Sequence, residues 1–226
     1  MIKKTYVRLI GIGIELLEKF VFNRRLAISY RKIFKETLYL KEKMYIVDVG
    51  ANRGQSAKFF SRVFHNHEII CFEANPNLIE KLKNKTRNIN RKIFCVALGN
   101  ESKETEFNIC VLDAISTLSN PNLKSSYNIF KSKVLKTDVK KLYKKINVEM
   151  KLLDSYLQDN LIESMDILKI DVEGFEHQVL MGSKLIISTL KPKIIQVEVH
   201  ENDQYQDYNP DLENLLKSYG YKLKNK

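Results

Sequence analysis

A chain of 226 residues is long enough for one α/β domain with a full hydrophobic core and short for two. Its 44% hydrophobic and 29% charged residues are typical of a soluble globular protein, and no uncharged stretch reaches the ~18 residues of a membrane span. Of the net charge of +11, residues 1–44 carry +7 and residues 131–145 carry +6, so the remaining chain, at −2, is close to neutral. This argues against a broadly basic nucleic-acid-binding domain.

The first 43 residues predict a basic amphipathic helical arm. The apolar residues Leu9, Ile12, Leu16 and Phe20 recur at helical spacing on one side. The charged residues Arg8, Glu15 and Lys19 lie on the other side. Such a stripe either packs on the rest of the chain or across a homodimer, or it makes peripheral contact with an anionic membrane. We expect packing, with lipid contact at the inner face of the membrane as a secondary role.

Residues 44–226 predict a single α/β domain in which strands and helices alternate. This alternation indicates a Rossmann-like, doubly wound, mostly parallel sheet with right-handed crossovers. Strands are expected at 45–49, 68–72, 92–96, 165–170 and 194–199. Helices are expected at 55–64, 77–87, 175–188 and 211–219.

The loop after the first strand has the spacing D-x-G-x-x-x-G, set by Asp48, Gly50 and Gly54. A dinucleotide fingerprint would need glycine where Asn52 stands, and no P-loop lysine is present. An acidic residue before the first glycine would repel a pyrophosphate but suits the cationic amino end of S-adenosylmethionine. Glu73 ends the second strand, where a carboxylate can accept hydrogen bonds from both ribose hydroxyls. The glycines are expected to leave room for the ligand.

A long interruption, residues 101–160, separates the third strand from the fourth. It contains two β-like pieces, 105–111 and 146–152, on either side of a polar stretch with seven lysines between Lys131 and Lys145. We expect this insertion to lie over the mouth of the site and to select the substrate, the alternative being a disordered surface loop.

Acidic residues and a histidine follow the fourth and fifth strands, at the sheet edge where α/β proteins bind ligands. They are Asp171, Glu173, Glu198, His200 and Glu201. In one reading His200 is a general base with an ordinary pKa near ~6.5, oriented by a carboxylate. In the other, Asp171, Glu198 and His200 hold Mg²⁺ or Mn²⁺ that binds the substrate hydroxyl. Asp171, Glu198 and His200 are therefore the candidate catalytic residues.

The chain around the fourth strand resembles the signature of the FkbM-type methyltransferases, a branch of the class I S-adenosylmethionine-dependent enzymes, in the run Leu168-Lys-Ile-Asp-Val-Glu-Gly-Phe-Glu176. Other similar segments occur in the family's order over about residues 44 to 223. They are Val47-Asp-Val-Gly-Ala-Asn-Arg-Gly54, Phe72-Glu-Ala-Asn-Pro76, Val96-Ala-Leu-Gly-Asn100, Ser116-Thr-Leu118, Leu153-Asp-Ser-Tyr-Leu157, Val179-Leu-Met-Gly-Ser183 and Ile195-Gln-Val-Glu198.

The resemblance implies O-methylation of a hydroxyl on a small molecule, such as a sugar, a glycan or its lipid-linked precursor. The expected cofactor-binding residues are Asp48, Gly50, Asn52, Gly54, Glu73, Ala97 beside adenine, and Asp171. One feature departs from the family, because only Gly220–Lys226 follow the last helix, where a class I sheet ends in two strands. A nucleic-acid (RNA) methyltransferase and a non-catalytic S-adenosylmethionine-binding, membrane-docked protein are the alternatives.

Cysteine usage bears on the compartment. The three cysteines, Cys71, Cys95 and Cys110, form no CxxC motif, and two of them lie in predicted strands. Reduced thiols in a cytoplasmic protein are therefore expected, and a zinc site is not.

Overall fold

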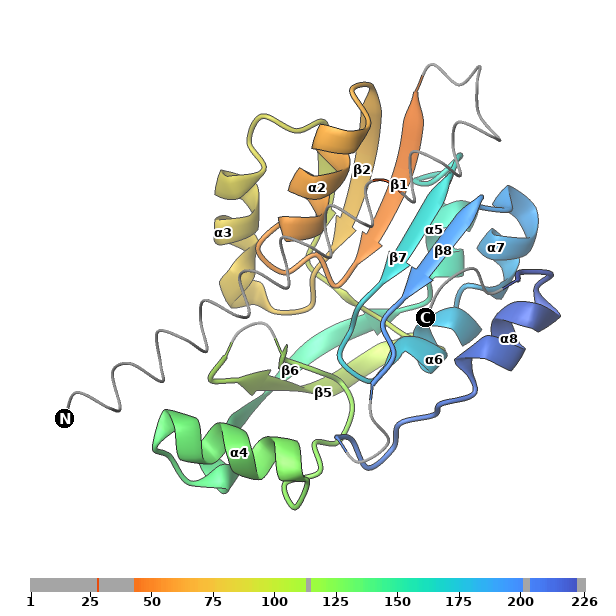
Figure 1. The fold of residues 1–226 in the computed structure, drawn as a ribbon. Coiled ribbons are helices and arrows are strands. Elements are labelled where there is room, and N and C mark those ends of the chain that lie inside the picture. Colours follow the sequence, from red (N-terminus) through yellow and green to blue (C-terminus); the bar gives the residue numbers. More distant parts are fainter. Residues whose placement is uncertain (1–27, 29–42, 113–114, 201–203, 223–226) are drawn as a thin grey trace.

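A computed structural model describes residue 28 and residues 43–112, 115–200 and 204–222 (Figure 1). Its core is a parallel five-stranded sheet with the order β3-β2-β1-β7-β8. The strands are β1 (Met44–Val49), β2 (His67–Phe72), β3 (Arg91–Phe94), β7 (Ile167–Ile170) and β8 (Ile194–Val197). The predicted Rossmann-like α/β fold is confirmed, and these strands lie where the sequence predicts them, with ends shifted by up to two residues.

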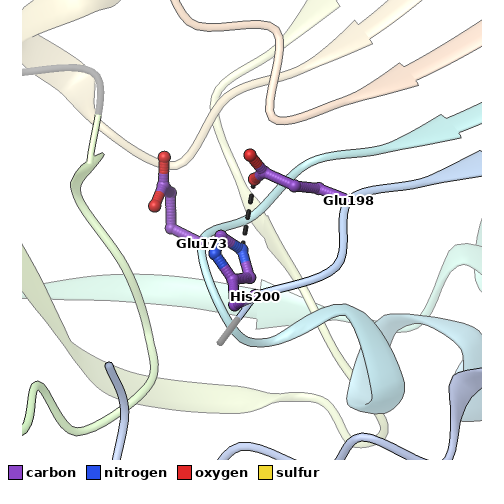
Figure 2. A group of neighbouring side chains, drawn as sticks. All are labelled: Glu173, Glu198 and His200. Carbon is purple, nitrogen blue, oxygen red and sulfur yellow. Dashed lines mark ion pairs between the residues drawn. The ribbon is translucent and has the colours of Figure 1, made fainter. Parts of the chain in front are cut away.

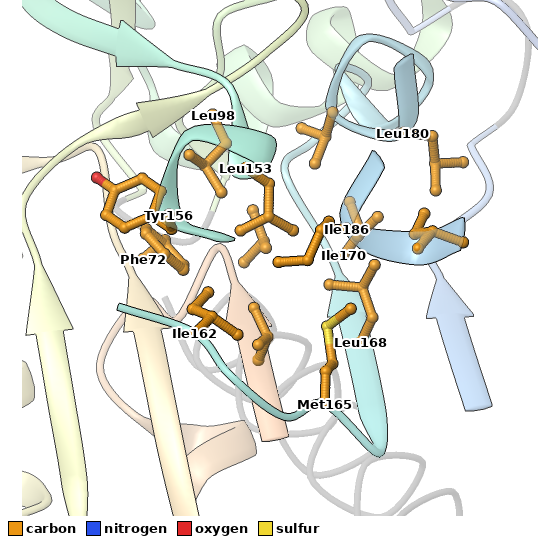
Figure 3. Close-up of a cluster of buried hydrophobic side chains, with 14 of the residues drawn as sticks. Phe72, Leu98, Leu153, Tyr156, Ile162, Met165, Leu168, Ile170, Leu180 and Ile186 are labelled. Carbon is orange, nitrogen blue, oxygen red and sulfur yellow. The ribbon is translucent and has the colours of Figure 1, made fainter. Parts of the chain in front are cut away.

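Helices cover both faces of this sheet (Figure 1). One face packs on α2 (Gln55–Val63) and α3 (Pro76–Lys85) through a cluster that includes Phe60, Leu82 and Ile167. The other face packs on α5 (Leu153–Gln158), α6 (Glu176–Met181), α7 (Lys184–Leu190) and α8 (Leu212–Ser218). Figure 3 shows this second cluster, which includes Phe72, Leu153, Leu168 and Ile186. Both faces are apolar because strands buried on two sides alternate between two cores.

The predicted helix 175–188 is wrong as one element, because it breaks at Gly182 into α6 and α7. A side chain at Gly182 would overlap the carbonyl oxygen of Gly99, so only glycine permits this close approach. The new helix start is capped by Asp154, whose carboxylate accepts the backbone N–H groups of Leu185 and Ile186 at 3.0 and 2.8 Å. Neither partner could be found from helical periodicity, because both lie far away in the sequence.

The insertion is an ordered subdomain over its described residues. Its three-stranded sheet has the order β4-β6-β5, with β4 (Ala97–Leu98), β5 (Lys103–Cys110) and β6 (Tyr143–Lys151). Strands β5 and β6 lie at the two predicted β-like pieces, and they pair antiparallel. Between them in the chain lie α4 (Ser126–Leu135) and the short 3-10 helix η2 (Val139–Lys141). Within the predicted range 101–160, the residues of α5 pack in the main core.

The described part of the chain has no strand after α8, so β8 is the edge of the central sheet there. All three cysteines are free thiols, two of them buried. Within the described ranges, no helix combines the length and apolarity needed to span a bilayer. The arm predicted for residues 1–43 lies outside these ranges except for residues 28 and 43, and its packing, dimer and membrane roles stay predictions.

Candidate functional site

The loop after β1 turns sharply towards α2. Gly50, Asn52 and Gly54 have φ values of 79°, 50° and 83°, in the left-handed region that glycine and asparagine tolerate best. The backbone N–H groups of Gly50 and Ala51 both donate to the carbonyl oxygen of Phe72, each at 3.0 Å. The loop is thereby tied to the end of β2.

The glycines of this loop are needed for the chain's own packing. A side chain at Gly50 would overlap the carbonyl oxygen of Asp171, and one at Gly54 would press on Thr86 and Leu82 of α3 and its end. The sequence suggested that these glycines leave room for a ligand. The atoms that they make room for here belong to the neighbouring strand end and helix.

Glu73 lies at the end of β2, as predicted, and is buried. Its two carboxylate oxygens each accept a backbone N–H at 2.7 Å, one from Asn52 and one from Asn75. Burial raises the pKa of Glu73 to about 7, although both backbone donors oppose the shift. The side chain therefore links the glycine loop to the segment that follows β2.

Asn75, next to Glu73, has a half-used side chain. Its amide oxygen accepts the N–H of Asn77 at 3.1 Å and caps α3. Its amide nitrogen is buried and has no hydrogen-bond partner among the described residues. A buried donor without a partner is costly, so this one is a candidate contact for a bound ligand.

Lys169 is a functional-site residue that the sequence analysis missed. In the register of β1 with β7 it stands opposite Asp48, and its Nζ lies 3.2 Å from Asp48 Oδ1 and 3.0 Å from Asp171 Oδ2. Burial by itself would lower the pKa of Lys169, but the carboxylates of Asp48 and Asp171 raise it by more. The net shift is upward, so the ammonium is retained. A lysine inside the apolar strand Ile167–Ile170 was the available signal.

This ion pair bears on two predicted roles. Asp48 is fully buried and its carboxylate faces Lys169, so a direct contact with the amino end of a cofactor stays a prediction. Asp171, whose side chain is 40% exposed, has one face on Lys169 and the other open. Burial by itself would raise the pKa of Asp171, but Lys169 and an interaction with Glu198 lower it. The same interaction adds to the rise that burial causes in the pKa of Glu198.

The structure brings Glu173, Glu198 and His200 together at the carboxyl ends of β7 and β8 (Figure 2). One potential ligand atom from each lies within 4.8 Å of the others. His200 Nε2 is 3.1 Å from Glu198 Oε2, and both carboxyl groups lie above the imidazole ring in this view (Figure 2). The predicted trio of Asp171, Glu198 and His200 stays a prediction. The group that lies close together here has Glu173 in place of Asp171, which pairs with Lys169.

Glu176 holds the loop between β7 and α6. It is fully buried, and its Oε1 accepts the N–H groups of Val172 and Gly174, both at 3.1 Å. The same oxygen lies 3.4 Å from His200 Nε2. This contact cannot be found from the position of Glu176 in its helix, because it depends on where β8 ends.

A strained turn presents Glu173 to the cluster. Its φ of 58° and the 96° of Gly174 both lie in the left-handed region, which is unusual for glutamate. The ring of Tyr205 packs so close to Gly174 that a side chain there would overlap it. Tyr205 also donates its hydroxyl to Glu173 Oε2 at 2.7 Å.

The insertion contributes to the same edge. Thr117 donates its hydroxyl to the carbonyl oxygen of Glu173 at 2.6 Å, and Pro121 forms a β-bridge with Tyr205. The expectation that the insertion selects the substrate stays a prediction. These contacts supply a route by which it can do so.

The cluster has unusual protonation equilibria. Burial raises the pKa of Glu173 to about 8 and that of Glu198 to about 7. Burial lowers the pKa of His200, but Glu176 and Glu198 outweigh it and raise the value to about 10. This shift favours an imidazolium at neutral pH, and the role of His200 as a general base stays a prediction.

The chemistry of these side chains suits a divalent cation. Carboxylate oxygens bind both Mg²⁺ and Mn²⁺, and an imidazole nitrogen favours Mn²⁺. His200 would have to exchange its contacts with Glu176 and Glu198 for the metal. Whether a metal binds therefore stays a prediction. Ala97 is buried in β4 and pairs with Met150, and its place beside adenine is likewise untested. Glu201 lies outside the described residues.

Comparisons with known proteins agree on one family. Residues 48–223 match the family described as the methyltransferase FkbM domain. The chain is 24% identical over 197 residues to the 2-O-methyltransferase NoeI of Sinorhizobium fredii (strain NBRC 101917 / NGR234), covering 86% of this chain and 79% of that protein. It is 26% identical over 224 residues to the methyltransferase sdnD of Sordaria araneosa, covering 86% and 81%.

Proposed function

Because this chain belongs to the FkbM methyltransferase family, we propose that it transfers a methyl group from S-adenosylmethionine to a hydroxyl oxygen of a sugar, in a glycan or its lipid-linked precursor. The relative from Sinorhizobium fredii is named a 2-O-methyltransferase, which favours oxygen as the acceptor atom. The observation that carries the proposal is the acidic cluster at the ends of β7 and β8, beside the glycine loop of β1.

The residues at the end of β2 fit an adenosine-containing cofactor. Glu73 offers carboxylate oxygens that each have capacity beyond the one backbone N–H they accept. The free amide donor of Asn75 stands next to it. A carboxylate and an amide in this position suit the two hydroxyls and ring atoms of a nucleoside.

When bound, S-adenosylmethionine supplies a methyl carbon on a positively charged sulfur, which leaves as a thioether when the acceptor oxygen bonds to that carbon. The acceptor hydroxyl must lose its proton in this step. Glu198 suits the task because its side chain is 42% exposed and because its pKa is raised to about 7. We assign it the role of proton acceptor.

His200 then acts on Glu198 and not on the substrate. Its imidazolium lies between Glu176 and Glu198 and holds the second carboxyl group in place. The carboxyl group of Asp171 interacts with that of Glu198, which adds to the rise that burial causes in the pKa of Glu198, and Asp171 is itself anchored by Lys169. These contacts fix the base in position, and positioning supplies much of the rate in a displacement reaction.

A metal-assisted version uses the same cluster differently. Glu173, Glu198 and His200 would hold Mg²⁺ or Mn²⁺, which lowers the pKa of a bound hydroxyl. Treatment with EDTA distinguishes the two versions. Activity lost with EDTA and restored by Mg²⁺ or Mn²⁺ supports the metal, whereas unchanged activity supports Glu198 alone.

The proposal is tested with purified protein, S-adenosylmethionine and a panel of nucleotide sugars, free glycans and glycolipids, with detection of the demethylated cofactor. Turnover with a sugar acceptor is the expected result. Turnover only with RNA, or cofactor binding without turnover on any acceptor, would contradict it. Calorimetry of Glu73→Ala should show most of the cofactor affinity lost, with the exposed Glu80→Ala as control. Preference for NAD⁺ would refute the cofactor assignment.

A further inference from the structure

Helix α4 of the insertion is oriented with its polar residues inwards and its apolar residues outwards. Asn128 and Lys131 are buried against the subdomain. Phe130 and Val134 are 65% and 60% exposed. This is the reverse of the pattern for a surface helix, whose apolar side normally packs on the core.

Specific polar contacts fix this orientation. Lys131 donates to the hydroxyl of Tyr143 at 2.9 Å, and its Nζ also lies 4.4 Å from the centre of the Tyr127 ring. The side-chain oxygen of Asn128 accepts a hydrogen bond from the Tyr143 hydroxyl at 3.1 Å, and its side-chain nitrogen donates to the carbonyl oxygen of Asn122 at 2.9 Å. Because the buried polar groups have partners, rotating the helix to hide its apolar side would leave them unsatisfied.

The outer face combines apolar side chains with lysines. Its exposed apolar residues are Tyr127, Ile129, Phe130 and Val134. Exposed lysines flank them on the helix and just beyond it: Lys124, Lys133, Lys136, Lys140 and Lys141. Asp138 is the single acidic residue between positions 131 and 145, against seven lysines. We call these exposed apolar residues and lysines the α4 face.

We propose that the α4 face docks on an anionic bilayer surface. Aromatic and aliphatic side chains surrounded by lysines are the combination that inserts among headgroups and attracts acidic lipids. A second copy of the chain fits the face poorly, because a symmetric contact would bring like charges together. A nucleic acid fits it poorly as well, because its phosphates would pair with the lysines and leave the exposed Phe130 and Val134 without an apolar partner.

The same subdomain contacts the acidic cluster. Thr117 contacts Glu173, and Pro121 contacts Tyr205. A docked α4 face would therefore hold the acidic cluster near the membrane surface. Resting on the proposed function, this favours a lipid-linked acceptor over a free sugar. The docking itself is independent of catalysis, so a protein without methyltransferase activity on any acceptor would still bind vesicles.

A tryptophan reporter tests the docking directly, because the full chain contains no tryptophan. Phe130→Trp should give emission that shifts to the blue with vesicles of phosphatidylcholine and phosphatidylglycerol, but not with phosphatidylcholine alone. Leu185→Trp, at an exposed position of α7, is the matched control and should not shift. Rising salt should reverse the shift, because it screens the lysines. No shift at Phe130→Trp would overturn the proposal.

A second pair of variants measures the contribution of the α4 face to binding. Phe130→Ser with Val134→Ser should weaken co-sedimentation with the anionic vesicles about tenfold. Met181→Ser with Leu185→Ser, exposed apolar residues of α6 and α7, should leave it unchanged. Both pairs should keep the unfolding temperature and cofactor affinity of the parent. Two results would refute the proposal. Undiminished vesicle binding by Phe130→Ser with Val134→Ser would place the membrane contact elsewhere. A change in the oligomeric state of this variant, without weaker vesicle binding, would assign the α4 face to contact with a second copy of the chain.

Discussion

Glu198 and His200 show how neighbouring residues change the role that a side chain can play. Histidine is the usual candidate for a base near neutral pH because of its ordinary pKa. Here two carboxylates keep His200 charged, and burial together with Asp171 raises the pKa of Glu198 to about 7. In the proposed assignment, the group that accepts a proton at neutral pH is therefore the glutamate.

The pH dependence of turnover follows from this assignment. Glu198 accepts a proton only when it is ionised, so kcat should fall as the pH drops through about 7, with a single acid limb. Glu198→Gln should lower kcat about 10²-fold or more and leave cofactor affinity nearly unchanged. The exposed Glu163→Gln is the control. An acid limb that persists in the residual activity of Glu198→Gln would assign the base to another group.

Lys169 has a structural role at the same scale. Lys169→Met should lower the free energy of unfolding by about 3 kcal/mol, because Asp48 would remain buried without a counter-charge. Lys103→Met removes an exposed ion pair with Glu101 and should change it by less than about 0.5 kcal/mol. Denaturant unfolding measures both. Equal effects would show that the buried pair contributes little.

At the scale of elements, the site depends on how closely the loop after β1 approaches the end of β7. Gly50 permits this approach because it has no side chain. Gly50→Ala should therefore destabilise the domain by more than Gly220→Ala, whose φ of 88° is equally unfavourable but whose surroundings are open. Thermal unfolding of the two variants compares them. The difference isolates the clash with the Asp171 carbonyl, since the backbone strain is common to both, and equal losses would argue against that clash.

The segment from β7 to α6 supplies most of the charged side chains at the carboxyl ends of β7 and β8. It supplies Lys169, Asp171, Glu173 and Glu176, each with a different task. Its reverse turn is set by positive φ at Glu173 and Gly174 and is closed by the Glu176 carboxylate. The run of alternating charged and apolar residues in the sequence thus becomes a loop whose charged side chains point to several partners.

At the scale of the whole molecule, the N-terminal arm and the α4 face are two separate candidates for contact outside the domain. If the arm packs on protein, deleting residues 1–40 should lower the unfolding temperature or convert a dimer to a monomer. Light scattering and thermal unfolding measure this. The deletion should keep salt-sensitive vesicle binding, because the α4 face is still present. A deletion variant with unchanged stability and no vesicle binding would assign the membrane contact to the arm.

The sequence by itself determined the fold class, the strand order along the chain and the family. Alternating apolar periodicity reports burial on one or two faces, and short motifs such as Asp48-Val-Gly50 and the run from Leu168 to Glu176 are local features. The confirmed strands and the match over residues 48–223 follow from such local information. The two β-like pieces of the insertion were likewise found from their composition.

Only the tertiary structure decided which of the candidate residues meet. Lys169 pairs with Asp48 through the register of two strands that are distant in the sequence, and this occupies Asp171 and leaves Glu173 to join Glu198 and His200. The protonation of His200 depends on Glu176 and Glu198, which come from different elements. The outward apolar side of α4 is fixed by contacts with Tyr143 on another strand. Electrostatic and hydrogen-bond partners depend on distance in space, and sequence spacing reveals that distance only within one element.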